Sequence, residues 1–302
     1  MGFEDLARIS IVTEDDSVVV SGGDSSDWEA IRLNEDPEGM FDTEVELKTI
    51  SVAGMEGGFD GGEEVPVREL TLPFNCYAPE GGTIEETISR LRKLLWRRTF
   101  EWHYETQHSG LRWLRCKRSK SIKVNPKRDW NLDNYALATV EAVALNPNYE
   151  STPLEVIVTN PSSGTNTLWV PMWNPTDQKA WPEWAFKPNG TASFSFADFS
   201  FNNEQEIDPT WTPGQHASRM INLVPINKMW SVMSHPLMDP YVAADLSNAD
   251  GQMGAVEPLY WVPPYTGTAD SPVLLPVTIN GPAGAQAKFT LRRFWSAEMG
   301  LE

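Results

Sequence analysis

Hydrophobic and polar residues alternate in several short runs of the first 150 residues, and this two-residue period predicts β-strands. In the run ELTLPFNC, Leu70, Leu72, Phe74 and Cys76 alternate with residues that are mostly polar. Similar alternation occurs at residues 44–49 (EVELKT), 100–104 (FEWHY) and 135–145 (YALATVEAVAL). The first half is therefore expected to be mainly β, as a barrel-like domain over residues 1–150.

One segment of this half has a helical period instead. Thr83 and Glu86 follow Gly81-Gly82 and form a capping box, which satisfies two backbone N–H groups at a helix start. Apolar residues then recur at helical spacing: Ile84, Ile88, Leu91 and Leu95. Basic residues occupy the other face and the end: Arg90, Arg92, Lys93, Arg97 and Arg98. We expect an amphipathic helix over residues 84–97 that packs one stripe on a sheet.

The second half is a series of short β-like runs separated by proline and glycine turns. These runs are residues 154–159, 167–173, 192–201, 218–226, 272–279 and 287–295. Residues 202–217 and 245–257 have the composition of exposed loops. Several short strands with turn signals between them predict a β-sandwich, here rich in tryptophan, over residues 151–302. Because Phe294 and Trp295 would otherwise be exposed, we expect residues 294–302 to pack on another part of the protein or on a neighbour.

Charge is sorted by position along the chain. The 302 residues carry a net charge of −18. Residues 1–64 hold 18 acids and three bases, whereas residues 90–128 hold 13 bases and two acids. An acidic face that meets a basic face of a neighbour makes a head-to-tail contact, and such contacts form rings when they close. The candidate contacts between subunits are Asp15, Asp16, Glu35, Asp36, Glu44, Glu46, Arg90, Arg97, Arg112, Arg115, Lys117 and Arg118.

Two other interpretations of this charge pattern stay open. The acids and bases can pair inside one subunit or simply face water, where ion pairs contribute little. The basic segment 90–128 can also face nucleic acid, although the acidic total argues against a general nucleic-acid binder. No apolar stretch is long enough for a membrane helix. The start MGFEDLARISIV does not have the features of a secretory signal, and Leu6 replaces the Ser or Thr of a myristoylation site.

The sequence contains no recognisable catalytic or metal-binding motif. Cys76 and Cys116 lack metal-site spacing and are expected to be buried free thiols, although the neighbours Arg115 and Lys117 allow a lowered pKa at Cys116. The four histidines are scattered, and the chain has no HExxH, Gly-x-Ser-x-Gly or phosphate-loop pattern. Glycoside hydrolysis needs two carboxylates that face one cleft, and Asp177, Glu183 and Asp198 are candidates for them. Any acidic chain contains such pairs, so their presence does not indicate an enzyme. We therefore expect neither an enzyme nor a bound metal or cofactor.

The tryptophans of the second half are candidates for binding a glycan or a partner. Trp173, Trp181, Trp184 and Trp211, together with Trp169, are dense in this region, and sugars stack on aromatic rings. Polar residues that can bond hydroxyls lie near them: Asn174, Asp177, Gln178 and Asn189. The alternative is that these rings fill the core of the sandwich or a subunit contact. Their exposure discriminates between the two interpretations.

The order of these features resembles the distal tail proteins of long-tailed siphophages. The segment VPVRELTLPFNCYAPEGGTIEETISRLRKLL (65–95) is similar to the core of that family, with a strand, a glycine-rich turn and then the helix. LWVPMWNPTDQKAWPEWAF (168–186) resembles the opening of the family's second domain. RRFWSAEMGLE (292–302) is similar to the ends of minor tail proteins of phages that infect actinobacteria.

This resemblance implies a structural virion protein at the tail tip, assembled in the host cytoplasm. Its N-terminal domains would form a hexameric ring that continues the tail tube, and its C-terminal domains would be galectin-like or carbohydrate-module-like sandwiches at the periphery. The implied partners are further copies of the chain, the tail tube protein, the tail hub and the tape measure protein. A cell-envelope glycan is an alternative partner, as a host-recognition module. No membrane insertion and no specific nucleic-acid binding are implied.

Overall fold

A computed structural model describes residues 7–23, 29–51, 53–54, 56–125, 129–254 and 256–302. The chain divides into two compact units. Unit 1 comprises Met1–Ser151 and Trp295–Leu301, and unit 2 comprises Thr152–Phe294 and Glu302. The first boundary lies one residue from the predicted one. The predicted second domain extended to residue 302, whereas Trp295–Leu301 lie with unit 1. The prediction on the N-terminal signal rests partly on residues 1–6, and that on myristoylation rests on Leu6; these residues lie outside the described part.

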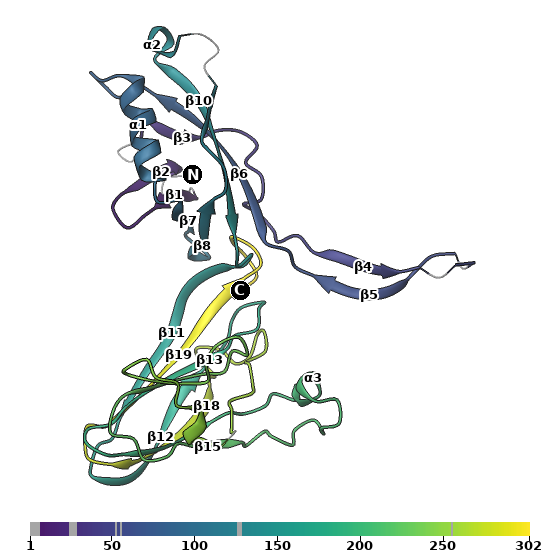
Figure 1. Ribbon diagram of the computed structural model, residues 1–302, viewed down its shortest axis with the longest axis vertical. Helices are drawn as coiled ribbons and strands as arrows, with labels where there is room; N and C mark the ends of the chain where they lie inside the picture. Colours follow the sequence, from purple (N-terminus) through teal and green to yellow (C-terminus); the bar gives the residue numbers. More distant parts are fainter. Residues whose placement is uncertain (1–6, 24–28, 52, 55, 126–128, 255) are drawn as a thin grey trace. The chain divides into compact units, whose positions relative to one another are not determined.

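Unit 1 contains an antiparallel sheet that curves until its ends meet. Its strands run in the order β2-β1-β7-β8-β10-β6-β3, with β9 added to β10. Their bounds are β1 Arg8–Val12, β2 Ser17–Ser21, β3 Ile31–Leu33, β6 Arg68–Tyr77, β7 Thr99–Thr106, β8 Gly110–Arg118, β9 Lys123–Asn125 and β10 Tyr135–Ala144. The outermost strands β2 and β3 lie beside each other, which gives the expected barrel-like form (Figure 1).

The helix α1 (Ile84–Leu94) covers this sheet with its apolar stripe. The predicted capping box is present at Thr83 and Glu86, and the buried stripe packs in the same core as the strands. The helix ends at Leu94, three residues before the predicted end, because the chain turns there toward β7. Arg98 makes that turn with a positive φ of 66°. A second, short helix α2 (Trp130–Asp133) is capped by the Asp129 side chain, which accepts from the Asn131 N–H.

Both cysteines are buried in this core as free thiols. Burial raises the pKa of the Cys76 thiol and of the Cys116 thiol to about 12. The alternative of a low pKa at Cys116 is wrong, because the side chain points into the core and away from the basic side chains of its neighbours in sequence.

The C-terminal segment Trp295–Leu301 is held on unit 1 by two buried arginines. Arg112 of β8 is fully buried and donates to the carbonyls of Ala297 (2.9 Å) and Gly300 (2.7 Å). Its guanidinium lies 3.8 Å from the centre of the Trp295 ring. Trp295 in turn donates from Nε1 to Ser151 Oγ at 2.9 Å. The segment therefore completes the core of unit 1.

Arg68 of β6 ties the same segment to the stretch that precedes β4. It donates to the carbonyls of Ser296 (2.8 Å) and Phe41, and to Thr43 Oγ1. Thr43 Oγ1 also donates to the Ser296 carbonyl at 2.7 Å. A single buried guanidinium thus fixes two segments that lie more than 250 residues apart in the sequence.

Unit 2 is built of two antiparallel sheets that share one core. The larger sheet has the order β17-β16-β13-β19-β11, and the smaller has the order β12-β18-β14-β15. The bounds are β11 Tyr149–Thr159, β12 Gly164–Met172, β13 Pro182–Lys187, β14 Ser193–Ala197, β15 Met220–Asn222, β16 Trp230–Met233, β17 Tyr241–Ala243, β18 Val273–Gly281 and β19 Gln286–Trp295. The sequence pattern missed β13, β16 and β17, which are short. The predicted loops contain α3 (Glu204–Ile207) and the 3₁₀ turn η3 (Asp250–Gln252).

Candidate assembly surfaces

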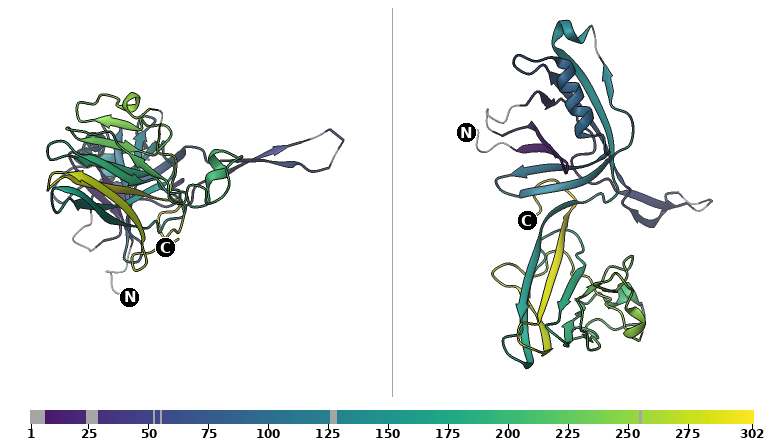
Figure 2. Two further views of the ribbon diagram at one scale, coloured as in Figure 1. Left: turned by 90° about the horizontal axis from the view of Figure 1, so that it is seen from below. Right: turned by 60° about the vertical axis from the view of Figure 1, so that its left-hand side comes forward.

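The strands β4 (Glu46–Ile50) and β5 (Phe59–Glu64) form a hairpin that no other described element of unit 1 covers. They pair only with each other, and every residue of both strands is exposed. The hairpin extends away from the other strands of unit 1 in each view (Figures 1 and 2). The alternation at residues 44–49 correctly predicted a strand, but both of its faces are open to solvent.

This hairpin, with its flanks, is acidic and carries large apolar side chains. We call residues 44–50 and 59–65 the acidic arm. Its acids are Glu44, Glu46, Asp60, Glu63 and Glu64, and its one base is Lys48, which pairs with Glu64. Its exposed apolar residues are Val45, Leu47, Ile50, Phe59 and Val65. A solvent-exposed two-stranded ribbon with this many apolar side chains is marginal by itself and has the character of a contact surface.

A complementary surface lies at the end of α1. We call Arg92, Lys93, Trp96 and Arg98 the basic patch. All four side chains are exposed, and the Trp96 ring is 62% exposed. Among the residues that the structure describes, Arg92, Lys93 and Arg98 have no ion-pair partner. The basic patch therefore combines free positive charge with an exposed aromatic ring.

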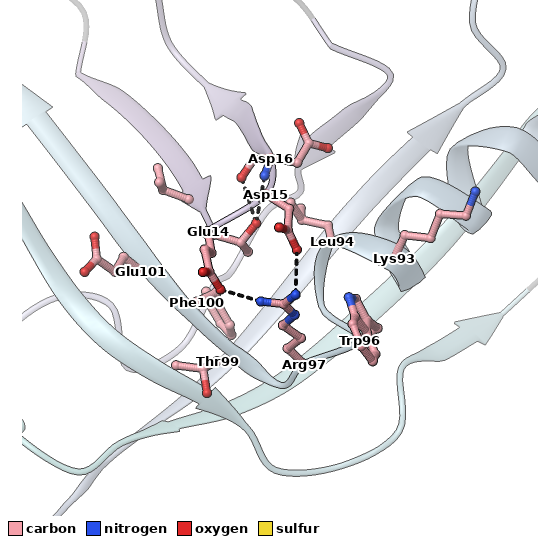
Figure 3. A pocket seen from close by; sticks show the side chains of 12 residues that line it. Glu14, Asp15, Asp16, Lys93, Leu94, Trp96, Arg97, Thr99, Phe100 and Glu101 are labelled. Atoms are coloured by element: carbon pink, nitrogen blue, oxygen red, sulfur yellow. Dashed lines mark hydrogen bonds and ion pairs between the residues drawn. The ribbon is translucent and has the colours of Figure 1, made fainter.

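Beside the basic patch, an open cleft of about 1070 Å³ separates the end of α1 from the turn between β1 and β2. Figure 3 shows the Arg97 guanidinium between the carboxylates of Glu14 and Asp15, with which it forms ion pairs. Along the helix, Arg90 pairs with Asp16 (3.3 Å) and Glu29 (2.6 Å), and the Glu29 hydrogen bond raises the pKa of Arg90.

At the turn between β1 and β2, four of the candidate contact residues therefore have partners in their own chain: Asp15, Asp16, Arg90 and Arg97. Pairing inside one subunit was the alternative that the sequence left open, and it occurs at these positions. The side chains of these four are all partly exposed. The structure contains a single chain, so their use between subunits stays a prediction.

Arg112 requires a correction. It was a candidate for a surface contact, but it is fully buried under the C-terminal segment and cannot reach a neighbour. Arg115 on the same strand is exposed and pairs with Glu150 at 3.1 Å. Of the other candidates, Lys117, Glu35, Asp36, Glu44 and Glu46 are exposed and Arg118 is half-buried. The basic residues Lys127 and Arg128 lie outside the described residues.

The tryptophans of unit 2 divide into core and surface. Trp184 is buried against Phe186, Phe196 and Phe289, so its assignment as a glycan contact was wrong and it is a core residue. The other three candidates are half-buried, and each packs on its own chain. Trp173 lies under Arg293, Trp181 contacts Trp261 and His235, and Trp211 contacts His216. Trp169 on β12 is the exposed one, at 57%.

A buried carboxylate organises the loop at residues 200–216. Glu204 accepts from the Ser200 hydroxyl and from the His216 N–H (3.0 Å), while the His216 ring contacts Tyr260. Burial alone raises the pKa of Glu204, but these hydrogen bonds outweigh burial and lower the pKa to about 2. The loop that was predicted to be exposed is therefore held in place by the Glu204 side chain, which is fully buried.

We expect acid to release this loop. Because the folded pKa of Glu204 lies below its ordinary value of 4.5, its ionised form stabilises the loop above that pH, and this stabilisation is lost as the pH falls toward 2. The protection factors of residues 200–216, which correct for the fall of the intrinsic exchange rate with pH, should decrease over this pH range. The Glu204→Gln variant serves as the control: its exchange should already be faster at pH 7 and should change less with pH. Equal pH profiles for the two proteins would contradict the assignment.

Comparison with known proteins agrees with this architecture. No protein-family model matches the sequence, and no curated protein matches it. Among solved structures, the crystal structure of the Dit protein of phage SPP1 aligns with a TM-score of 0.55 at 11% identity, over 94% of this chain and 98% of that one. The chain shares its fold with that Dit protein. A chain of the phage P2 baseplate, in its activated conformation with Ca, aligns with a TM-score of 0.51 at 9% identity, over 95% of this chain and 98% of that one.

No group of three or more His, Cys, Asp or Glu side chains within the described part of the chain is placed to hold a metal ion. None of the helices found there combines the length and the apolar character needed to cross a membrane. Of the carboxylates considered for glycoside hydrolysis, Asp198 is buried in an ion pair with Arg219, and Glu183 pairs with Arg292.

Proposed function

We propose that this chain is a structural component of a phage tail tip and forms a closed ring there. The acidic arm carries this proposal, because it exposes both charge and apolar surface that its own unit leaves uncovered. The fold supports it. The SPP1 Dit protein, which aligns over nearly its whole length, is described as a paradigm of the hub adsorption apparatus in phages that infect Gram-positive bacteria.

In this proposal, the acidic arm of one subunit lies on the basic patch of the next. Leu47, Ile50 and Phe59 cover the exposed Trp96 ring, while the arm carboxylates approach Arg92 and Lys93. Arm and patch are different surfaces of one subunit, so the contact is head-to-tail, and a constant rotation closes it into a ring. Burying apolar surface supplies affinity, and the opposite charges set the register.

We propose a hexamer at the lower end of the tail tube. Its partners would be the tail tube protein, the tail hub and the tape measure protein, and it would act in the virion without catalysis. Assembly in the host cytoplasm and the likeness of residues 292–302 to tail proteins of actinobacterial phages stay predictions.

The mass of the purified protein in solution tests the ring. Light scattering should give about 200 kDa for six chains of 33.9 kDa, and a lower mass at high salt, because salt screens the charges across each contact. A monomer of 33.9 kDa at low and at high salt, at tens of micromolar protein, contradicts self-assembly through these surfaces.

A charge exchange tests which surfaces meet. The arm variant carries Glu46→Lys and Glu63→Lys, and the patch variant carries Arg92→Glu and Lys93→Glu. Each variant alone should stay monomeric, since like charges then face each other at every contact. An equimolar mixture should regain the wild-type mass, because an alternating ring pairs each reversed arm with a reversed patch. The single chain that carries all four changes should also assemble.

This experiment separates a specific contact from a general loss of solubility. Rescue in the mixture requires that arm and patch meet across subunits, because nothing else is complementary between the two variants. Assembly of either variant alone would contradict the arm-to-patch contact. The Asp239→Lys and Asp270→Lys pair is the matched control: it makes the same charge change at exposed acids of unit 2 that are not candidate contacts, and should assemble like the wild type.

A further inference from the structure

The smaller sheet of unit 2 is unusual in its lack of charge. None of the residues of β12, β14, β15 and β18 is Asp, Glu, Lys, Arg or His, whereas 22% of the whole chain is Asp, Glu, Lys or Arg. Inward-facing positions are apolar as in any sandwich. The outward-facing positions of these strands, however, are exposed or half-buried and still uncharged.

The larger sheet of the same unit carries charged side chains on its outer face. Its outer face carries ion pairs between neighbouring strands, from Lys288 to Glu155 at 2.6 Å and from Arg292 to Glu183 at 2.8 Å. Exposed sheet faces are ordinarily kept soluble by such charges. The smaller sheet therefore lacks the charges that the larger sheet carries, and its outer face presents uncharged side chains instead.

The outer face of the smaller sheet combines an aromatic ring with a row of hydroxyl and amide groups. Trp169 stands on the edge strand β12, opposite Pro276 of β18, and is 57% exposed. Two residues before Trp169 on β12, and therefore on the same face, a polar row crosses all four strands: Thr167, Thr278, Ser195 and Asn222. The Thr167 and Thr278 hydroxyls lie 2.9 Å apart. At the usual strand spacing this row is roughly 15 Å long.

We propose that this face binds a neutral polysaccharide. The C–H face of a sugar ring is apolar and slightly positive, so it stacks on the electron-rich face of the Trp169 indole. The hydroxyls of adjoining sugars exchange hydrogen bonds with the row from Thr167 to Asn222. A row of roughly 15 Å accommodates several sugar units along one chain. An acidic glycan fits poorly, because the face offers it no cation and the protein is acidic overall.

The test is calorimetric titration of the intact protein with neutral hexasaccharides. The probes are cellohexaose, maltohexaose, mannohexaose and the hexamer of N-acetylglucosamine, with hexagalacturonate as the charged probe. We expect at least one neutral probe to bind and the charged probe not to bind. The Trp169→Ala variant should raise the Kd of the neutral probe about tenfold. Thr278→Val, which keeps the shape and removes the hydroxyl, should also raise the Kd.

Trp96→Ala is the matched control, because that ring is exposed to a similar degree in unit 1. It should leave sugar binding unchanged, and Trp169→Ala should leave the oligomer mass unchanged. Loss of assembly in Trp169→Ala would identify the face as a protein contact and overturn the proposal. Failure of every neutral probe, equal binding of hexagalacturonate, or unchanged affinity in the variants would also overturn it. The sugar titrations do not depend on whether the ring forms.

Discussion

Replacing Arg112 with methionine lowers the free energy of unfolding of unit 1 by about 3–5 kcal/mol, because two buried carbonyls lose their donor, at about 1–3 kcal/mol each, and a cation–π contact is lost. The variant loses the hydrogen bonds to Ala297 and Gly300 and the contact with the Trp295 ring. The carbonyls of the C-terminal segment then stay buried without these donors. Methionine fills much of the space, so the loss reports the polar contacts more than a cavity.

This loss can be measured by urea unfolding that is monitored by hydrogen exchange. Peptides of β6 and β10 then report on the unfolding of unit 1 separately from that of unit 2. Arg115→Met on the same strand is the matched control. Its side chain is 56% exposed and pairs with Glu101 and Glu150, so the expected loss is below about 1 kcal/mol. A similar loss in both variants would contradict the role assigned to the C-terminal segment. Removing residues 295–302 should destabilise unit 1 at least as much as Arg112→Met.

Replacing Trp184 with alanine lowers the free energy of unfolding of unit 2 by about 3–5 kcal/mol, as for large aromatic residues in other cores. The ring is buried among Phe186, Phe196 and Phe289, with centroid distances of 5.8, 5.6 and 4.8 Å. Its removal leaves a cavity between the two sheets, because β13, β14 and β19 all contribute to this cluster and cannot all move inward.

Peptides of β13 and β19 report on unit 2 in the same exchange experiment. Trp169→Ala is the control, since an exposed side chain outside any buried cluster changes stability by only about 0.5 kcal/mol. If Trp184→Ala were as mild as Trp169→Ala, the ring would not belong to the core. The pair of variants therefore separates tryptophans that hold the sandwich together from those available to a ligand.

The sequence predicted the elements that are determined by neighbours along the chain. The alternation at residues 69–76 and 135–145 requires a strand, since one face must be apolar for the sheet to pack. The capping box at Thr83 and Glu86 fixes the helix start, because both residues lie within one turn. The helix end was predicted three residues late, since Arg97 and Arg98 suit a helix end as well as the turn that follows.

Contacts between distant segments could not be predicted in this way. The composition of residues 1–64 and 90–128 predicted attraction between them, yet only the fold decides which charges meet inside the chain. Arg90 and Arg97 reach acids of the turn between β1 and β2, because the end of α1 lies beside that turn. Nothing in the sequence distinguishes Arg112 from the other arginines of the basic segment. Its burial depends on Trp295, which is 183 residues away in sequence.

The tryptophans of unit 2 also show what the sequence can and cannot predict. Tryptophan density in the second half was visible in the sequence and led to a glycan hypothesis. Which rings are exposed depends on the side of each strand that faces the core, and that is set by the partner sheet. Trp184 points into the core, whereas Trp169 points outward beside the polar row.

By itself, the sequence determined that this protein is mainly β, with one capped helix, two regions and opposite charges in two segments. These properties follow from residue type and local spacing, which act over a few residues. Only the tertiary structure decided that residues 44–50 and 59–65 form an uncovered arm, that the last residues complete unit 1, and that one sheet face is free of charge. Each of these depends on which distant segments exclude water from one another, and burial between such segments has no local signature in the chain.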